Sequence, residues 1–251
     1  MARRKSGTKL PAPYLRRVSI RPEGLEGKAG YPFDMPWLDE DFELRFTTPV
    51  TVIVGENGAG KSTLIEALAA SAGFDEAGGS RDHRAVSHRG PSGALLGGVF
   101  RAGWLPKVTQ GWFFRAETFF SVARYLDDVG SPNADFLSGS HGEGFIRVFE
   151  ERMSRQGIYF MDEPESALSP KRQLELLKFL AKVQQEESAQ VIMATHSPLL
   201  MTVPDATLLK VTRRGFEPTH YRDTEHFQLY QSFIADPEDF VQCALDDEEF
   251  M

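Results

Sequence analysis

The chain has 251 residues, which is enough for one α/β domain with a full hydrophobic core. A hydrophobic content of 41% and a charged content of 25% are ordinary for a soluble globular protein, and no apolar run approaches the ~20 residues needed to span a bilayer. The single cysteine, Cys243, excludes an internal disulfide and a cysteine-rich zinc site, so we expect a cytoplasmic protein without membrane insertion.

Charge is distributed unevenly along the chain. The net charge of −8 argues against a surface that coats nucleic acid, although residues 1–30 are rich in Lys and Arg. The tail from Asp236 onward carries carboxylates and no basic residue. This pattern fits a basic arm that touches nucleic-acid phosphates, and it equally fits two solvated ends.

The first half of the chain alternates apolar runs with turn residues. We expect strands over 14–20, 42–46 and 50–54, and then a helix that ends near residue 70. Residues 73–98 are rich in glycine, with several arginines and histidines, and we expect a flexible excursion from the core there.

The segment 55–63 reads Gly-Glu-Asn-Gly-Ala-Gly-Lys-Ser-Thr and fits the phosphate-binding pattern G-x-x-x-x-G-K-[ST]. Its glycines let backbone N–H groups turn toward phosphate oxygens, and the helix that follows adds the positive end of its dipole. Lys61 can reach the β- and γ-phosphates, and the Ser62 hydroxyl can bind Mg²⁺. The expected nucleotide-binding residues of this loop are Gly55, Asn57, Gly58, Ala59, Gly60, Lys61, Ser62 and Thr63.

The second half contains two further buried strands, which we expect over 157–161 and 190–194. An aromatic cluster over 112–120 leads into a short helical region. Two short helices, over 227–234 and 240–245, follow toward the acidic tail.

A longer helix lies between the two buried strands. Ser169 caps this helix and Pro170 starts it, and both residue types are favoured at those positions. Leu174, Leu177 and Leu180 mark its expected buried stripe.

Hydrolysis of a bound nucleotide needs a carboxylate near Mg²⁺, a group that positions the attacking water, and positive charge on the γ-phosphate. Asp162 and Glu163 end an apolar strand and point in different directions, so Asp162 can face Mg²⁺ while Glu163 faces the water. His196 follows the next strand, where its ring can donate a hydrogen bond to the γ-phosphate or to the water. We therefore expect Glu163, His196 and Lys61 to be catalytic, and Ser62 and Asp162 to bind the metal.

This set of motifs resembles an ABC-type ATPase cassette. Residues 55–63 correspond to Walker A, 158–163 to Walker B, and His196 to the switch histidine. Residues 165–169 resemble the D-loop, with Ser169 where the family usually has Asp, and 137–143 resemble the LSGGQ signature. The preferred register puts the signature serine at Ser140 and its second glycine at Gly142; the competing register uses Ser138.

The segments 111–117, 140–143 and 162–170 are still more similar to the small bacterial ATPases that are usually labelled AAA, whose core is ABC-like. The segment Asp223-Thr224-Glu225-His226 also resembles the C-terminal region of that family. The resemblance implies an α/β P-loop fold with a mostly parallel central sheet flanked by helices and a small antiparallel β part at the N-terminus. It implies a single domain over 1–251, with a helical signature subdomain near 112–153 and a helical appendage over 223–251.

Two features of transporter cassettes are not evident. In transporter cassettes a glutamine, the Q-loop residue, follows the strand that corresponds to the start of the aromatic cluster. Here that strand ends in Phe-Arg-Ala-Glu, so Arg115 or Glu117 occupies the place of the glutamine. The aromatic residue that stacks on adenine is unassigned among four candidates. These candidates are Tyr14, Tyr31, Phe33 and Trp37.

The resemblance implies an ATPase that binds and hydrolyses ATP with Mg²⁺. Two copies would sandwich two ATP molecules, each site combining Walker residues of one chain with Ser140 and Gly142 of the other. The homodimer would drive or gate a partner, a protein or a nucleic acid, in a role such as DNA repair or phage defence. The alternatives are a low-turnover nucleotide switch that regulates a partner protein or nuclease, and the ATPase subunit of a membrane transporter.

Overall fold

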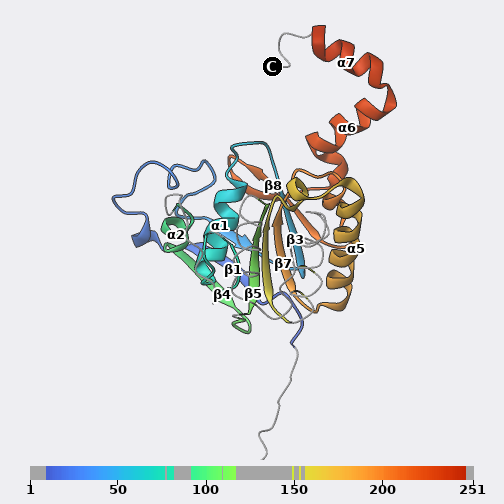
Figure 1. Ribbon diagram of the computed structural model, residues 1–251. Coiled ribbons are helices and arrows are strands. Elements are labelled where there is room, and N and C mark those ends of the chain that lie inside the picture. The colour runs from blue at the N-terminus through green and yellow to red at the C-terminus, as the bar shows by residue number, and fades with distance from the viewer. Residues whose placement is uncertain are drawn as a thin grey trace, which may run out of the picture.

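The computed structural model describes residues 10–76, 78–81, 92–108, 110–116, 149, 153 and 156–246 (Figure 1). A six-stranded sheet forms the centre, with the strand order β5-β6-β7-β3-β8-β9. Its strands are β3 (Val50–Val54), β5 (Gly111–Arg115), β6 (Ile158–Asp162), β7 (Gln190–Ala194), β8 (Thr207–Thr212) and β9 (Gly215–Pro218). All neighbouring strands pair in parallel, except that β8 and β9 pair with each other in antiparallel orientation.

A second sheet is antiparallel and has the strand order β2-β1-β4. Its strands are β1 (Leu15–Ile20), β2 (Glu43–Arg45) and β4 (Phe100–Trp104). Two of them come from the N-terminal part of the chain, so the predicted antiparallel β part is confirmed, as is the mostly parallel central sheet. Strand β4 joins from further along the chain.

The central strands form because their residues are apolar on both faces. Strands β3 and β7 match the predicted ranges, and every residue in them is buried. In β3, Val52 and Val54 pack in one hydrophobic cluster while Ile53 packs in another, as alternating side chains of a strand require. Each face of the sheet therefore needs a helical cover.

Helix α1 (Lys61–Ser71) packs with the cluster that contains Ile53, and α5 (Pro170–Glu186) packs with the opposite cluster. Figure 1 shows these two helices on the two sides of the central sheet. Four short 3₁₀ turns connect the described elements. They are η1 (Pro22–Gly24), η2 (Pro164–Ala167), η3 (Leu200–Thr202) and η4 (Tyr221–Asp223).

Helix α5 starts as predicted, with Ser169 at the N-cap position, although the Ser169 side chain makes no capping hydrogen bond. The predicted stripe is wrong in part, because the helix buries Leu176, Leu180 and Val183, whereas Leu174 is 43% exposed. Leu174 lies roughly 200° around the helix from Leu176, on the solvent side. Of the predicted residues, only Leu180 lies in the buried stripe, with Leu177 at its border.

Part of the predicted glycine-rich excursion is a helix, α2 (Ser92–Gly97), that packs against α1. A Cβ atom on Gly97 would lie 2.7 Å from the carbonyl oxygen of Ala67, so only glycine permits this close approach. Leu96 is fully buried there. Residues 92–97 therefore belong to the core layer around α1.

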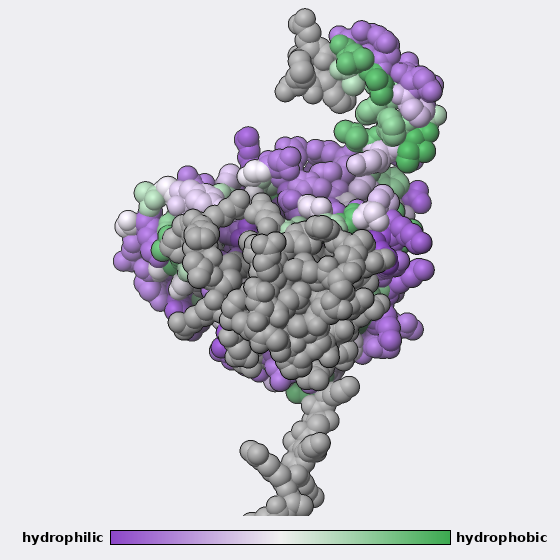
Figure 2. Space-filling model, in the orientation of Figure 1, coloured by the Kyte–Doolittle hydropathy of each residue, from purple (hydrophilic) through white to green (hydrophobic). Residues whose placement is uncertain are grey.

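The last two helices, α6 (Glu225–Ala235) and α7 (Pro237–Asp246), extend away from the sheets (Figure 1). Both predicted helices lie within them. Figure 2 shows apolar surface on this arm, which we define as residues 225–246. Its exposed large apolar side chains are Leu229, Tyr230, Phe233, Ile234, Val241 and Leu245. Within the described part of the chain, no helix is both long enough and apolar enough to cross a membrane.

One buried side chain, Gln190, joins the two sheets. Its Oε1 atom accepts hydrogen bonds from the backbone N–H groups of Tyr14 and Leu15, both at 2.8 Å, and its Nε2 atom donates to the Leu15 carbonyl at 2.9 Å. Gln190 is fully buried, so water cannot replace these bonds. The start of β1 is therefore fixed against the start of β7.

We predict that Gln190→Leu lowers the free energy of unfolding by about 2–5 kcal/mol, because it leaves two buried N–H groups and one carbonyl unpaired. Urea unfolding followed by circular dichroism measures this loss. Gln242→Leu, on exposed α7, is the matched control and should change stability little. Equal losses in the two variants would contradict the role of Gln190.

Candidate nucleotide-binding site

The loop between β3 and α1 has the backbone conformation of a phosphate-binding loop. Gly55, Gly58 and Gly60 have φ angles of +155°, +79° and +87°, which side-chain-bearing residues rarely adopt. Gly60 is the N-cap residue of α1, so the unpaired N–H groups of the first helical turn face the loop. The loop and helix together offer backbone donors to an anion.

Trp37 holds this loop from the N-terminal part of the chain. Its indole N–H donates a 2.9 Å hydrogen bond to the Ala59 carbonyl, and its ring is almost fully buried. A Cβ atom on Gly60 would lie 2.7 Å from Met35 Sδ and 2.8 Å from Trp37 Nε1. Glycine is therefore required at position 60 for packing as well as for its backbone conformation.

Lys61 is held inside the loop. Its Nζ atom donates hydrogen bonds to the carbonyl oxygens of Gly55 and Glu56, each at 2.8 Å, and the residue is 4% exposed. Burial lowers the pKa of Lys61, while the negative charges of Glu163 and Asp162 oppose this shift. A buried ammonium group is thus placed where phosphate oxygens would replace the two carbonyls.

Asp162, the last residue of β6, lies beside the first turn of α1. The Ser62 hydroxyl donates a hydrogen bond to its carboxylate, and Arg115 Nη2 lies 3.9 Å from its Oδ2 atom. Burial raises the pKa of Asp162 to about 6, and the Arg115 charge acts in the opposite direction. Arg115 in turn forms a buried 2.8 Å ion pair with Glu66 of α1.

The donor set of Ser62 and Asp162 fits Mg²⁺, which prefers hard oxygen ligands and keeps several waters. The Oδ1 atom of Asp162 is buried and has no hydrogen-bond partner among the described residues. An orphaned carboxylate oxygen of this kind is costly unless a cation binds it. The hydroxyl and this oxygen are therefore the atoms that would hold the metal.

Glu163 and His196 lie next to each other beyond the ends of β6 and β7. Glu163 has a left-handed backbone conformation, with φ 47°, and its N–H donates to the Ala194 carbonyl at 3.0 Å. The Nε2 atom of His196 lies 3.6 Å from Glu163 Oε1. The backbone N–H of His196 donates to Glu165 Oε1 at 2.5 Å, so the Glu165 carboxylate fixes the position of this histidine.

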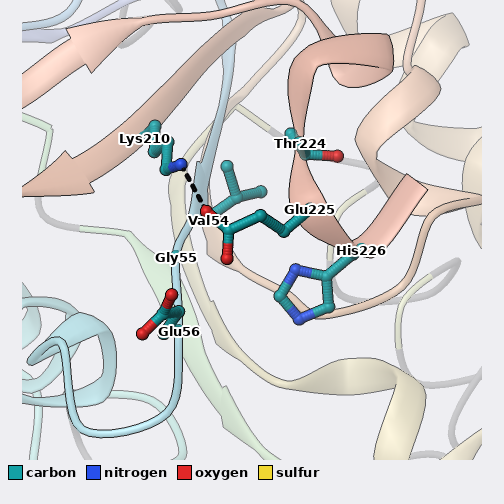
Figure 3. Close-up of a pocket in the computed structure, with 7 residues that line it drawn as sticks. All are labelled: Val54, Gly55, Glu56, Lys210, Thr224, Glu225 and His226. Atoms are coloured by element: carbon teal, nitrogen blue, oxygen red, sulfur yellow. Dashed lines mark hydrogen bonds and ion pairs between the residues drawn. The ribbon is translucent and has the colours of Figure 1, made fainter. Parts of the chain in front are cut away.

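A second histidine, His226, completes this group. It lies in the first turn of α6, and its Nε2 atom is 2.8 Å from Nδ1 of His196. Figure 3 shows His226 and its neighbour Glu225 facing Gly55 and Glu56 across a small pocket, with the Lys210–Glu225 ion pair drawn as a dashed line. The resemblance of residues 223–226 to the family's C-terminal region includes His226 but gives it no role, because no strand or spacing pattern connects it to His196.

The described residues bring together the predicted Walker A and Walker B residues and His196. Ser140 and Gly142, the competing Ser138, and Glu117 lie outside the described residues. Of the two residues considered for the Q-loop position, the structure therefore describes only Arg115, which is the last residue of β5.

The candidates for adenine stacking separate by exposure. Tyr14 is fully buried and Trp37 is 3% exposed, so neither ring face is available to a base. Tyr31 is 58% exposed, and its hydroxyl lies 3.0 Å from Oγ1 of Thr63. Phe33 is half-buried, so Tyr31 offers the most accessible ring beside the loop.

Two protein-family models match the chain. Residues 32–98 match a model described as "AAA domain", and residues 136–202 match one described as "AAA domain, putative AbiEii toxin, Type IV TA system". The first match contains the phosphate loop, and the second contains Asp162, Glu163 and His196.

Two curated relatives are named as ATP-binding proteins. The molybdenum import ATP-binding protein ModC of Haemophilus ducreyi is 26% identical over 168 residues, which are 59% of this chain and 46% of that protein. The "Probable siderophore transport system ATP-binding protein YusV" of Bacillus subtilis is 27% identical over 183 residues, which are 61% of this chain and 65% of that protein. The chain thus spans about half of the first relative and slightly less than two thirds of the second.

Solved structures with similar chains include the SMC head domain from Thermotoga maritima, with a TM-score of 0.47 and 15% identity over 82% of this chain and 99% of that one. They also include cbiO1 from Clostridium perfringens, with a TM-score of 0.45 and 16% identity over 92% of this chain and 98% of that one.

The phosphate loop, the carboxylates after β6 and the two AAA matches support an ABC-type P-loop ATPase. The ATP-binding relatives agree with this class. Neither import nor siderophore transport follows from them for this chain.

The His196 ring has an unusual environment that can be tested by titration. Burial lowers the pKa of His196 from 6.5 to about 4, and the positive charge of Lys61 adds to this shift. We expect NMR titration of the His196 ring to give a midpoint near pH 4. A midpoint at or above 6.5 would contradict the described burial.

The same shift makes stability depend on pH. The folded pKa of His196 lies below the unfolded value, so the unfolded chain takes up the proton first as pH falls. The contribution of neutral His196 is complete above pH 6.5 and is lost toward pH 4. In thermal unfolding, the melting temperature of wild type should therefore fall more steeply than that of His196→Gln as the pH is lowered from 6.5 to 4.

Proposed function

We propose that the protein hydrolyses ATP with Mg²⁺ and that two copies close over two ATP molecules. The observation that carries this proposal is the meeting of Lys61, Asp162, Glu163 and His196 at one edge of the central sheet. These residues supply a phosphate-binding cation, a metal ligand, a proton acceptor and a hydrogen-bond donor, which together are the parts that phosphoryl transfer needs.

In this proposal the backbone N–H groups of residues 55–63 surround the β- and γ-phosphates. Lys61 exchanges its two carbonyl partners for phosphate oxygens, and Ser62 and Asp162 would hold Mg²⁺. When bound there, Mg²⁺ would supply positive charge that offsets the charge developing on the phosphates. Arg115 keeps the Asp162 carboxylate oriented toward α1.

Glu163 orients a water molecule toward the γ-phosphorus and accepts its proton as the new P–O bond forms. The bond from the γ-phosphorus to the bridging oxygen breaks, which leaves ADP and inorganic phosphate. The Glu163 side chain is 40% exposed, so water reaches it. His196 donates a hydrogen bond from Nε2 to an oxygen of the γ-phosphate, and this contact orients the group that is transferred.

The second copy would complete each site with Ser140 and Gly142, as the resemblance to ABC cassettes implies. A serine hydroxyl and close backbone N–H groups would cap the γ-phosphate from the opposite side. Hydrolysis would remove this bridge between the chains, and the dimer would open. This opening would move a partner that is bound to the two chains.

We infer a protein partner, with a role in DNA repair or phage defence. The arm supports a protein because it combines exposed apolar side chains with carboxylates and lacks Lys and Arg, so nucleic acid would be repelled from it. The description of one matching family model as a toxin of a toxin–antitoxin system supports a defence role. A basic-edged apolar groove on the partner would complement this surface.

The names of the two curated relatives favour a second candidate, an ATPase subunit of a transporter. Arg115 weighs against it, because the place of the coupling glutamine is taken by an arginine that is buried against Glu66 and Asp162. An arginine that is buried in ion pairs at that position cannot also bind the surface of a membrane domain.

We predict that Glu163→Gln lowers the turnover of ATP by about 100-fold or more, because the amide cannot accept the proton of the water. Phosphate release measures turnover, and light scattering after size exclusion measures the mass. The variant should bind ATP and become dimeric only with ATP and Mg²⁺. Glu186→Gln, at an exposed position of α5, is the control and should retain turnover.

If Glu163→Gln stays monomeric at saturating ATP and Mg²⁺, the sandwich proposal fails. If wild type also releases no phosphate while it binds ATP, the protein acts as a nucleotide switch and the hydrolytic proposal fails with it.

The register of the signature segment gives a separate prediction. In the Glu163→Gln background, Ser140→Arg should abolish ATP-dependent dimers and leave ATP binding by the monomer within about two-fold, because its bulk and charge would enter the composite site. Ser138→Arg should leave the dimer intact. The opposite result would assign the signature serine to Ser138, and dimers in both variants would contradict a composite site.

A further inference from the structure

His196 and His226 form a direct ring-to-ring hydrogen bond. The Nδ1 atom of His196 lies 2.8 Å from Nε2 of His226, and the ring centroids are 4.8 Å apart. Burial is the main cause that lowers the pKa of both rings, and the charge of Lys61 acts in the same direction. Both rings are therefore neutral near pH 7, so one nitrogen of the contact must donate and the other must accept.

The surroundings of His196 Nε2 decide which nitrogen donates. This atom is buried, it has no hydrogen-bond partner among the described residues, and it lies 3.6 Å from the Glu163 carboxylate. An unprotonated Nε2 would direct a lone pair toward a negatively charged oxygen, whereas Nε2–H would direct a proton toward it. The protonated form is therefore favoured, and His196 Nδ1 must be the acceptor.

It follows that His226 donates from its own Nε2–H. The position of His226 is set by the root of α6, where the Thr224 side chain accepts a hydrogen bond from the Phe227 N–H at 3.3 Å and is itself almost fully buried. The neighbouring Glu225 forms a 2.8 Å ion pair with Lys210 of β8. The burial of Thr224 and the Glu225–Lys210 ion pair hold the first turn of α6 against the body of the protein.

We propose that His226 is a positioning residue that fixes the tautomer of His196, so that Nε2–H of His196 faces the nucleotide. The proposal rests on the proposed ATPase function for its consequence in turnover, but the tautomer itself does not depend on that function. Without the donor from His226, only Glu163 would favour Nε2–H, and its 3.6 Å approach is too long for a hydrogen bond, so His196 would populate both tautomers. In the other tautomer, the unprotonated Nε2 would repel a phosphate oxygen.

The first experiment reads the tautomer by long-range ¹H–¹⁵N correlation NMR, which distinguishes protonated from unprotonated ring nitrogens. In nucleotide-free wild type we expect His196 to be protonated at Nε2 and unprotonated at Nδ1. His226→Ala should give a mixture. His226→Gln should restore the wild-type pattern, because its side-chain amide N–H can reach the place of His226 Nε2. A protonated Nδ1 in wild type, or an unchanged tautomer in His226→Ala, would overturn the proposal.

The second experiment measures steady-state ATP hydrolysis by the same variants. His226→Ala should lower kcat about ten-fold with little change in the KM for ATP, and His226→Gln should recover most of the loss. His220→Ala is the matched control, because the His220 ring lies 4.3 Å from the Tyr221 ring and, among the described residues, no hydrogen bond joins it to His196. Loss of activity in Ala and Gln variants alike would show that His226 acts only through folding and would overturn the positioning role.

The two readouts separate the failure of each proposal. If wild type shows the expected tautomer but no phosphate release, the ATPase proposal fails and the His226 contact stands. If wild type hydrolyses ATP and His226→Ala turns over at the wild-type rate, the ATPase proposal stands and the positioning role fails.

Discussion

The site depends on the parallel pairing of β3, β6 and β7. In this register Ile53 of β3 is opposite Ala194 of β7, and Ala194 is opposite Asp162 of β6. The residues that follow these three positions are therefore delivered to the same edge of the sheet, although they come from distant parts of the sequence. The phosphate loop, Glu163 and His196 meet there because carboxyl ends of parallel strands point in one direction.

Burial of charge at this edge is the main energetic cost of the arrangement. Lys61, Asp162, Glu66 and Arg115 are all nearly excluded from solvent, and isolated charges in such positions would be strongly destabilising. Each is offset by neighbours: Lys61 by two carbonyls, and Arg115 by Glu66 and, at longer distance, Asp162. Among the described residues, the Oδ1 atom of Asp162 has no hydrogen-bond partner, so a bound cation could offset the cost of burying it.

The sequence predicted the strands that form this edge of the sheet because their residue patterns are compatible with only one structure. A strand that is apolar throughout, such as β3 or β7, can only be buried, and polar residues directly after it must lie at the sheet edge. Strand β8 mixes Thr and Lys with apolar residues and is only partly buried, so its pattern indicates no single structure. Helix α5 has leucines on several sides, and only the packing against β3 and β7 decides that Leu176, and not Leu174, is buried.

Contacts between distant side chains were beyond prediction. His196 and His226 are on different elements, and neither periodicity nor spacing encodes that their rings meet. The same holds for the Arg115–Glu66 ion pair, which joins the end of β5 to α1. Motifs predicted which residues carry the chemistry, whereas the structure was needed to show which residues orient them.

The most direct test of this account is a structure of Glu163→Gln bound to ATP and Mg²⁺. The account predicts that the β- and γ-phosphates lie on the N–H groups of residues 55–63, with the metal on Ser62 and Asp162. It also predicts that His196 Nε2 lies within hydrogen-bond distance of a γ-phosphate oxygen while Nδ1 still contacts His226. Phosphates bound elsewhere, or a His196 ring turned away from the γ-phosphate, would contradict it.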